Sequence, residues 1–243
     1  MKTSFFHKNY KPIITALAVL FFIISFFVYY QENFEHYRLL RGVFCFIFLG
    51  LLFFYNKKNT NNNIFAFLAC YGLSSVLTIW YENNILATLS MVLNFLSFLF
   101  LIRALLPKIN FKKMNVFFSI IFIVMLAING YLGYLLMDEL QDMTLSNSHF
   151  IFLVLTSMAV IFSTFLALLY NHVYNTKGSL VFALFVFLLF FADVFRAVAY
   201  YDIVSGDFTV HISRTLLIVA LCQLIHYTFI KKEKDELLYP HIF

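Results

Sequence analysis

The sequence predicts an all-α polytopic membrane protein, a bundle of about eight transmembrane helices with both termini in the cytoplasm. Of the 243 residues, 63% are hydrophobic and 12% are charged, which leaves too little polar surface for a soluble domain of this length. The apolar residues form solid blocks of about 18–25 residues, long enough to cross a hydrocarbon core of about 30 Å as helices. A membrane β-barrel would instead show alternating segments of about 10 residues. We expect a single integral membrane domain over residues 1–243.

Short polar connections separate the eight predicted spans. The first apolar block is too long for the hydrophobic region of a signal peptide and lacks a small-residue cleavage site before Gln31, so we expect a retained helix. The later connections are rich in Asn, Asp, Lys and Gly, and none is long enough to hold a soluble domain. In chain order, the predicted helices cover residues 12–30, 37–55, 63–81, 84–106, 114–137, 148–172, 179–201 and 209–230.

The charges of the connections support each span in turn, because cytoplasmic connections of membrane proteins carry the excess of Lys and Arg. One side collects 13 of the 17 basic residues, namely Lys2, Lys8, Lys11, Lys57, Lys58, Arg103, Lys108, Lys112, Lys113, Lys177, Lys231, Lys232 and Lys234. The other side has only Arg38, Arg41, Arg196 and Arg214. Its connections hold acidic residues instead, namely Glu32, Glu35, Glu82, Asp138, Glu139, Asp142, Asp202 and Asp207. Because the alternation holds at every connection, eight spans fit better than seven or nine.

Several classes of function are disfavoured by the composition. The formal net charge is +5, but the basic residues lie beside hydrophobic blocks and form no patch of their own, so we expect no nucleic-acid partner. Cys45, Cys70 and Cys222 all lie inside apolar blocks without metal-ligand spacing, and we interpret them as small buried hydrophobic residues. No soluble-enzyme motif is present. We therefore predict no cofactor and no metal site.

Asp193 is the clearest polar exception within an apolar block. A charge near the bilayer centre costs at least about 2.5–3.5 kcal/mol, so it calls for a partner or a function. Arg196 follows at i+3 on the same helical face and could pair with the carboxylate. Two interpretations stay open: a buried ion pair that only stabilises helix packing, or a functional carboxylate that lines a polar cavity.

Other polar residues are predicted at a similar depth, and they either face the same interior or bond across packed helices. They are Ser74, Ser75, Asn94, Asn129, Thr156 and Ser157. Nearer the cytoplasm, Gln223, His226 and Tyr227 share one face of the last helix. That stripe could position a general base, or it could hold His and Tyr side chains that reach the membrane interface.

The arginines on the less basic side have two open interpretations. Arg38, Arg41 and Arg214 lie at the outer ends of the second and eighth predicted helices. A guanidinium group matches phosphate geometry, so these residues could hold a lipid headgroup. Alternatively, they pair with nearby acidic residues, namely Glu35, Glu82, Asp202 or Asp207.

The C-terminal third resembles the YhhN family, eight-helix membrane proteins that include the lysoplasmalogenases. The segment 178–197 is similar to the family pattern Gly-Ala-x-x-Phe-x-x-Ser-Asp-x-x-x-Ala, with Asp193 at the acidic position and Ala197 at the small residue four later. Ala192 stands where the family usually has Ser. Residues 222–225, Cys-Gln-Leu-Ile, resemble the family's Ala-Gln-x-Leu-Ile ending. The family's third-helix aspartate has no counterpart in residues 72–80.

This resemblance implies a lysoplasmalogenase-type hydrolase that cleaves the vinyl-ether bond of a lysophospholipid in a cell membrane, such as a bacterial inner membrane. Protonation of the enol ether requires an acid, and a water must capture the oxocarbenium ion. In this hypothesis Asp193 is the acid, and Asn94 or Gln223 orients the water. The candidate substrate-binding residues are Arg38, Arg41, Arg196, Arg214, Ser75 and His226. The alternative is a non-catalytic membrane module or small transporter in which Asp193 and Arg196 form a structural or gating pair.

Overall fold

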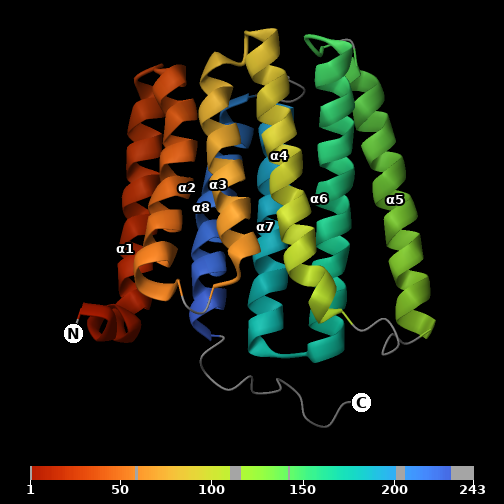
Figure 1. Ribbon diagram of the computed structural model, residues 1–243. Helices are drawn as coiled ribbons and strands as arrows, with labels where there is room; N and C mark the ends of the chain where they lie inside the picture. Colours follow the sequence, from red (N-terminus) through yellow and green to blue (C-terminus); the bar gives the residue numbers. More distant parts are fainter. Residues whose placement is uncertain (1, 58–59, 110–115, 142, 201–205, 231–243) are drawn as a thin grey trace.

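The protein is a bundle of long helices in the computed structural model, which describes residues 2–57, 60–109, 116–141, 143–200 and 206–230 (Figure 1). The described residues form no strand. The elements, in chain order, are α1 (Lys2–Tyr30), α2 (Phe34–Asn56), α3 (Asn62–Leu77), the 3₁₀ turn η1 (Thr78–Trp80), α4 (Asn84–Leu105), the 3₁₀ turn η2 (Leu106–Lys108), α5 (Val116–Gln141), α6 (Asn147–Tyr174), α7 (Lys177–Tyr200) and α8 (Gly206–Ile230). The predicted all-α bundle of about eight helices is confirmed.

Seven of these helices are long and apolar enough to cross a membrane, as expected of a multi-pass membrane protein. The exception is α5, whose described apolar segment is the shorter Ser119–Leu135. The prediction placed this span at residues 114–137, whereas the helix runs from Val116 to Gln141. It therefore extends further toward the acidic end than its hydropathy alone indicates.

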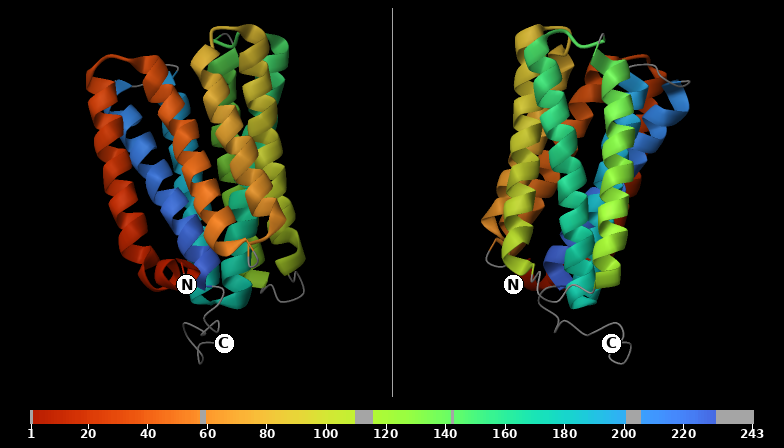
Figure 2. Two further views of the ribbon diagram at one scale, coloured as in Figure 1. Left: turned by 60° about the vertical axis from the view of Figure 1, so that its left-hand side comes forward. Right: turned by 90° about the vertical axis from the view of Figure 1, so that its right-hand side faces the viewer.

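The same seven helices pack in a closed ring. Going around it, α1 contacts α2, followed by α3, α4, α6, α7 and α8, which returns to α1. Helix α5 lies outside the ring against α6, at the edge of the bundle (Figures 1 and 2). The chain therefore leaves the ring after α4 and re-enters it at α6. This arrangement places α5 on the lipid side of its neighbour.

Polar residues in the connections cap the N-termini of the helices, which explains why the connections are rich in Asn. The side chains of Asn33, Asn61 and Asn83 each accept a backbone N–H of the first turn that follows. Ser146 does the same for α6. Such caps satisfy backbone donors that have no intrahelical partner. Each cap therefore fixes where its helix begins.

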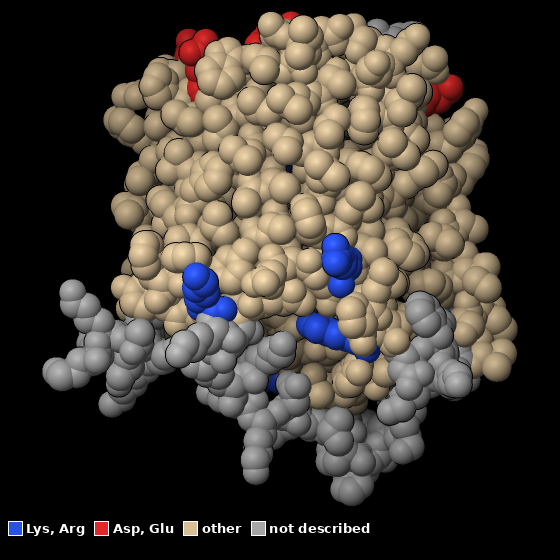
Figure 3. Space-filling view, viewed as in Figure 1, with Lys and Arg blue, Asp and Glu red and all other residues tan. Residues whose placement is uncertain are grey.

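The two ends of the bundle carry opposite charges (Figure 3). On the face in view, the Asp and Glu side chains of the described residues lie at the top, and the Lys and Arg side chains lie toward the bottom. Helix α1 begins and α8 ends at the bottom (Figure 1). We call the two ends the acidic end and the basic end. The positive-inside rule predicts that the basic end faces the cytoplasm.

Large aromatic side chains fill the interior between the helices. Phe67 is fully buried and its ring centroid lies 6.2 Å from that of Phe98 and 5.8 Å from that of Phe185. In lipid, close van der Waals packing rather than water exclusion holds helices together. At one point α2 and α3 approach so closely that a Cβ on Gly42 would lie 3.0 Å from the carbonyl oxygen of Gly72. This close approach brings the polar residues of α2 near those of α3.

Candidate functional site

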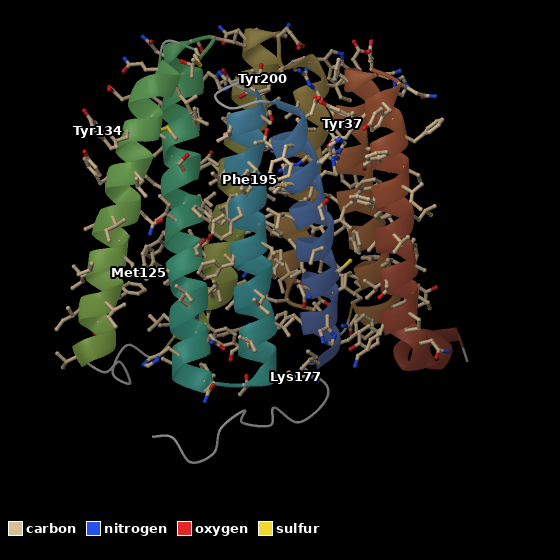
Figure 4. All side chains as sticks on the ribbon, turned by 180° about the vertical axis from the view of Figure 1, so that it is seen from behind. Tyr37, Met125, Tyr134, Lys177, Phe195 and Tyr200 are labelled. Atoms are coloured by element: carbon tan, nitrogen blue, oxygen red, sulfur yellow. The ribbon has the colours of Figure 1, made fainter. Side chains whose placement is uncertain are left out.

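A cavity of about 680 Å³ lies in the half of the bundle nearer the acidic end. Residues of α1, α2, α4, α5, α6, α7 and α8 line it, together with Thr78 of η1 and Tyr81. Two of the lining residues, Tyr37 and Tyr200, lie near the acidic end in Figure 4, far from Lys177 at the basic end. The volume is within the range of small-molecule sites, about 300–1,000 Å³.

Asp193 is the centre of a buried polar cluster on the cavity wall. Its Oδ1 accepts hydrogen bonds from Arg41 Nη2 at 2.6 Å and from the Tyr71 hydroxyl at 2.9 Å. The Arg196 Nη2 lies 3.3 Å from the same oxygen. Arg41 also donates to the Tyr71 hydroxyl. Three helices, α2, α3 and α7, therefore supply the groups that surround one carboxylate oxygen.

The predicted pairing of Asp193 with Arg196 is confirmed, but the closer partner comes from another helix. Arg41 and Asp193 expose only 7% and 11% of their side chains, against 25% for Arg196. A buried charge without a partner is strongly destabilising, so the Arg41 contact compensates the carboxylate where solvent cannot. The sequence indicates the i+3 neighbour Arg196 but does not indicate Arg41, which comes from another helix.

Four buried polar atoms of cavity-lining residues have no hydrogen-bond partner among the described residues. They are Asp193 Oδ2, Arg41 Nε, Arg214 Nη1 and Asn94 Oδ1. A buried polar atom that makes no hydrogen bond costs about 1–3 kcal/mol, so native proteins leave few of them unpaired. Two of these four atoms are donors on cationic guanidinium groups, and the other two are acceptors. It is suited to a ligand that carries both an anionic group and a hydrogen-bond donor.

The other two arginines of the cavity are anchored at its acidic end. Arg214 is buried, donates from Nη2 to the carbonyl oxygen of Tyr37 at 2.6 Å, and stacks with its Cζ 4.0 Å from the centroid of the Tyr37 ring. Arg38 donates to Glu82 at 2.8 Å, which is one of the acidic partners that we expected. The possible partner Asp202 lies outside the described residues. Among the described residues, four arginines and one aspartate line the cavity.

The wall formed by α5 and α6 is mainly apolar. It contains polar residues, but each of them donates to a carbonyl of its own helix: Asn129 to Met125, Thr156 to Phe152, and Ser157 to Leu153. Such i−4 bonds pair a donor of each side chain within its own helix. The cavity thus has a cationic side, formed by α2, α7 and α8, and an apolar side, formed by α5 and α6.

Of the predicted site residues, the structure brings six together in this cavity: Asp193, Asn94, Arg38, Arg41, Arg196 and Arg214. The other three are not among its lining residues. Ser75 is buried and donates to the carbonyl oxygen of Tyr71. His226 lies toward the basic end, where its Nδ1 is 2.8 Å from the Tyr10 hydroxyl. Gln223 lies one turn from His226 on α8, so both are displaced from Asp193 along the bundle.

The polar residues that were predicted at mid-depth also fall into two groups, those that line the cavity and those that do not. Asn94, Asn129, Thr156 and Ser157 line the cavity, as the shared depth predicts. Ser74 instead donates to the carbonyl oxygen of Ser90 at 2.8 Å and bonds α3 to α4, which is the alternative that we left open. Sequence position gives the depth of a residue but does not give the face of the helix that meets the cavity.

Sequence reasoning missed Tyr71 and Tyr37. Tyr71 contacts both Arg41 and Asp193, and Tyr37 holds Arg214. Tyr71 lies within a long apolar block and Tyr37 is the first residue of the second predicted span, and a tyrosine is an ordinary residue in both places. Tyr71 precedes the third-helix segment in which the resemblance implies an aspartate. Among the described residues, no group of three or more His, Cys, Asp or Glu could hold a metal ion.

Comparison of the chain with protein-family models, with curated proteins and with solved structures gives no match.

Proposed function

We propose that the cavity binds a lysophospholipid-like anionic amphiphile. The observation that carries this proposal is the lining, in which four arginines face one aspartate and the remaining surface is mainly apolar. Arg41 Nε and Arg214 Nη1 are the donors available for a phosphate oxygen, and the planar guanidinium group suits phosphate. A single apolar chain would occupy the side formed by α5 and α6.

We further propose that the bound amphiphile is hydrolysed at a vinyl-ether bond. A proton from Asp193 Oδ2 adds to the double-bond carbon remote from the ether oxygen and produces an oxocarbenium ion. Water attacks this ion and returns a proton to the carboxylate, and the resulting hemiacetal collapses to a fatty aldehyde and a glycerophospho-alcohol. Oδ2 is the carboxylate oxygen that has no hydrogen-bond partner among the residues the structure describes. Asn94 Oδ1 is available to accept a hydrogen bond from the attacking water.

A second candidate function is non-catalytic binding or transport of the same amphiphile. It is favoured by the three groups on Asp193 Oδ1, which resemble a structural or gating cluster. In this alternative, the negative headgroup competes with Asp193 for Arg41 and Arg196. Release of those arginines would then be coupled to binding. The two candidates share the ligand and differ in whether a bond is broken.

Aldehyde release from a reconstituted protein separates the candidates. Purified protein in lipid nanodiscs is mixed with a 1-alkenyl lysophospholipid, and aldehyde is measured over time. We expect turnover by the wild type and loss of turnover in Asp193→Asn. The matched control is Asp138→Asn, because Asp138 is exposed at the end of α5 and does not line the cavity. Its turnover should equal that of the wild type.

Binding without aldehyde would support the non-catalytic candidate. Binding is measured in the same samples with a non-hydrolysable 1-alkyl lysophospholipid. A folded wild type that neither binds this analogue nor releases aldehyde would contradict both candidates.

We also propose residence in a cell membrane, such as a bacterial inner membrane, with the cavity toward the outer leaflet. This follows from its position near the acidic end and from the positive-inside rule.

A further inference from the structure

Helix α5 is largely exposed in its middle. The four consecutive residues Ile123, Val124, Met125 and Leu126 are all exposed. Successive residues of an α-helix are rotated by about 100°, so four in a row sample every side of the helix. Much of the circumference of α5 is therefore exposed at this level, although the Phe122 ring packs on Phe165 of α6 at a centroid distance of 4.5 Å. Figure 4 shows α5 beside α6 at the edge of the bundle, with Met125 and Tyr134 marking its course.

The upper part of α5 nevertheless lines the same cavity as the buried arginines. Leu132 and Gly133 of α5 share the cavity with Arg41 of α2 and Asp193 of α7. Among the ring helices, α5 packs mainly on α6, and several residues of α7 also line the cavity. The cavity therefore reaches α5 through the wall of the ring, between α6 and α7.

This lateral part of the cavity lies at lipid depth and has exposed apolar residues on both sides. Leu132 on α5 is 56% exposed, and Phe191 on α7 is 43% exposed. Both lie far from the basic end, and the polar side chains of this wall donate to their own helices. A surface of this kind is compatible with an acyl chain and offers no compensation for a charge.

The end of α5 packs against α4 and α6 nearer the acidic end. Leu140 is fully buried in a cluster with Tyr81, Met91 and Leu153. Tyr81 is held in turn by a hydrogen bond of 2.7 Å between its hydroxyl and His149 Nε2. The cavity is therefore lined by buried residues near its acidic end and by the exposed apolar residues Leu132 and Phe191 at its lateral side.

We propose that α5 forms a lateral portal, in which the single apolar chain of the amphiphile passes between α5 and α7 into the surrounding lipid, and that Gly133 keeps this passage wide enough for the chain. This inference rests on the proposed function, because the arginines hold the headgroup while the portal holds the chain. The ligand then enters sideways from the bilayer and does not have to leave it.

Gly133 and Gly130 provide a matched pair for the test. Both lie on α5, one turn apart. A Cβ on Gly133 would meet only Ile161 Cδ1, at 3.7 Å, which is ordinary van der Waals contact, and Gly133 lines the cavity. A Cβ on Gly130 would meet nothing within 4 Å, and Gly130 is exposed away from the cavity. A leucine at position 133 therefore narrows the passage, whereas a leucine at position 130 extends into lipid.

The experiment measures the affinity of nanodisc-reconstituted protein for an anionic lysophospholipid with an 18-carbon chain and for glycerol 3-phosphate, which has the headgroup phosphate and no chain. We expect Gly133→Leu to weaken binding of the lysophospholipid about tenfold or more and to leave glycerol 3-phosphate unchanged. Gly130→Leu should bind both ligands as the wild type does. Gly133→Ala, whose Cβ fits without displacement, should give a smaller loss than Gly133→Leu.

The outcomes separate this inference from the proposed function. Unchanged lysophospholipid binding in Gly133→Leu overturns the portal and leaves the proposed function intact. A wild type that binds neither ligand overturns both. A readout that needs no variant is photolabelling of the wild type with a lysophospholipid that carries a diazirine at the end of its chain. Label on α5 or α7 peptides supports the portal, and label confined to α2 or α3 overturns it.

Discussion

Arg41 Nη2 lies 2.6 Å from Asp193 Oδ1, although the two residues are 152 positions apart in the chain. The contact joins α2 to α7 at the level of the cavity, and Tyr71 of α3 bonds to both members. Among the described residues, Asp193 is the carboxylate that lines the cavity, and its pairing with Arg41 also joins two helices. The contributions of this ion pair and of the neighbouring residues to stability and binding can be measured separately from any enzymatic activity.

Removal of the Arg41 charge should destabilise the protein strongly. Arg41→Met leaves Asp193 with the more exposed Arg196 as its cation, and breaking a buried ion pair costs about 3–5 kcal/mol. We expect a large fall in the midpoint of thermal unfolding in detergent. Arg196→Met should cost less, because Arg196 is more exposed and its contact is longer. The double variant Arg41→Met with Asp193→Leu should regain much of the lost stability, and a strictly additive loss would argue against the pairing.

Gly42 should be intolerant of a methyl group. A Cβ at this position would lie 2.4 Å from Val76 Cγ2 and 3.0 Å from the backbone oxygen of Gly72. Gly42→Ala would push α2 away from α3, and overpacking of this kind costs about 1–3 kcal/mol. Gly50 is on the same helix with nothing within 4 Å, so Gly50→Ala should be neutral or slightly stabilising. Equal unfolding midpoints for the two variants would contradict the close approach of α2 and α3.

The contact between Arg38 and Glu82 should give a small stability effect that depends on pH. Glu82 lies between α3 and α4, outside the membrane spans, and the hydrogen bond from Arg38 lowers its pKa below the ordinary value of 4.5. A carboxyl group with a lowered pKa in the folded state stabilises folding above its unfolded pKa. That contribution is lost as the pH falls through the lowered value. Because the Glu82 side chain is 71% exposed, the effect should be small.

Unfolding midpoints of the wild type and Glu82→Gln test this expectation. The difference between the two proteins should be constant at neutral pH and should shrink as the pH falls below the ordinary value of 4.5. A difference that grows on acidification would have the wrong sign for this ion pair. Glu35→Gln is a suitable control, since Glu35 is also exposed at the acidic end.

Arg214 should contribute to binding of an anionic headgroup. Its Nη2 is held by the carbonyl oxygen of Tyr37, and its Nη1 has no partner among the described residues. A hydrogen bond from a charged donor contributes about 1.5–3 kcal/mol, so Arg214→Gln should weaken lysophospholipid binding by about 10- to 100-fold. Arg103→Gln is the control, because Arg103 is exposed near the basic end. Equal losses in both variants would indicate a nonspecific effect of charge.

Hydropathy and charge predict most of the architecture because both act locally. Each helix must satisfy its own backbone in lipid, so apolar blocks mark the spans without knowledge of their neighbours. The alternation of Lys and Arg across the connections predicts the direction of each helix in the same way. The exception is α5, whose displacement from the ring depends on how tightly the other helices pack together. Nothing in its own residues indicates this displacement.

The candidate site was predictable only in part. Asp193 stands out because a carboxylate in an apolar block is costly, and Arg38, Arg41 and Arg214 stand out because they oppose the charge bias. Ser75 stands out by its mid-depth position, and Gln223 and His226 by their shared helical face, but the structure places all three outside this cavity. Polarity marks residues that need a partner, and it does not show which face of a helix they occupy.

The sequence by itself determined that this is a helical membrane protein with a basic and an acidic end, and that a few charged side chains lie where lipid cannot solvate them. Only the tertiary structure decided that Arg41 and Tyr71 surround Asp193 and that α5 stands outside a ring of seven helices. The physical reason is the range of the interactions. Transfer of a helix into lipid depends on its own residues, whereas a buried ion pair and a cavity depend on side chains that meet only after the helices have packed.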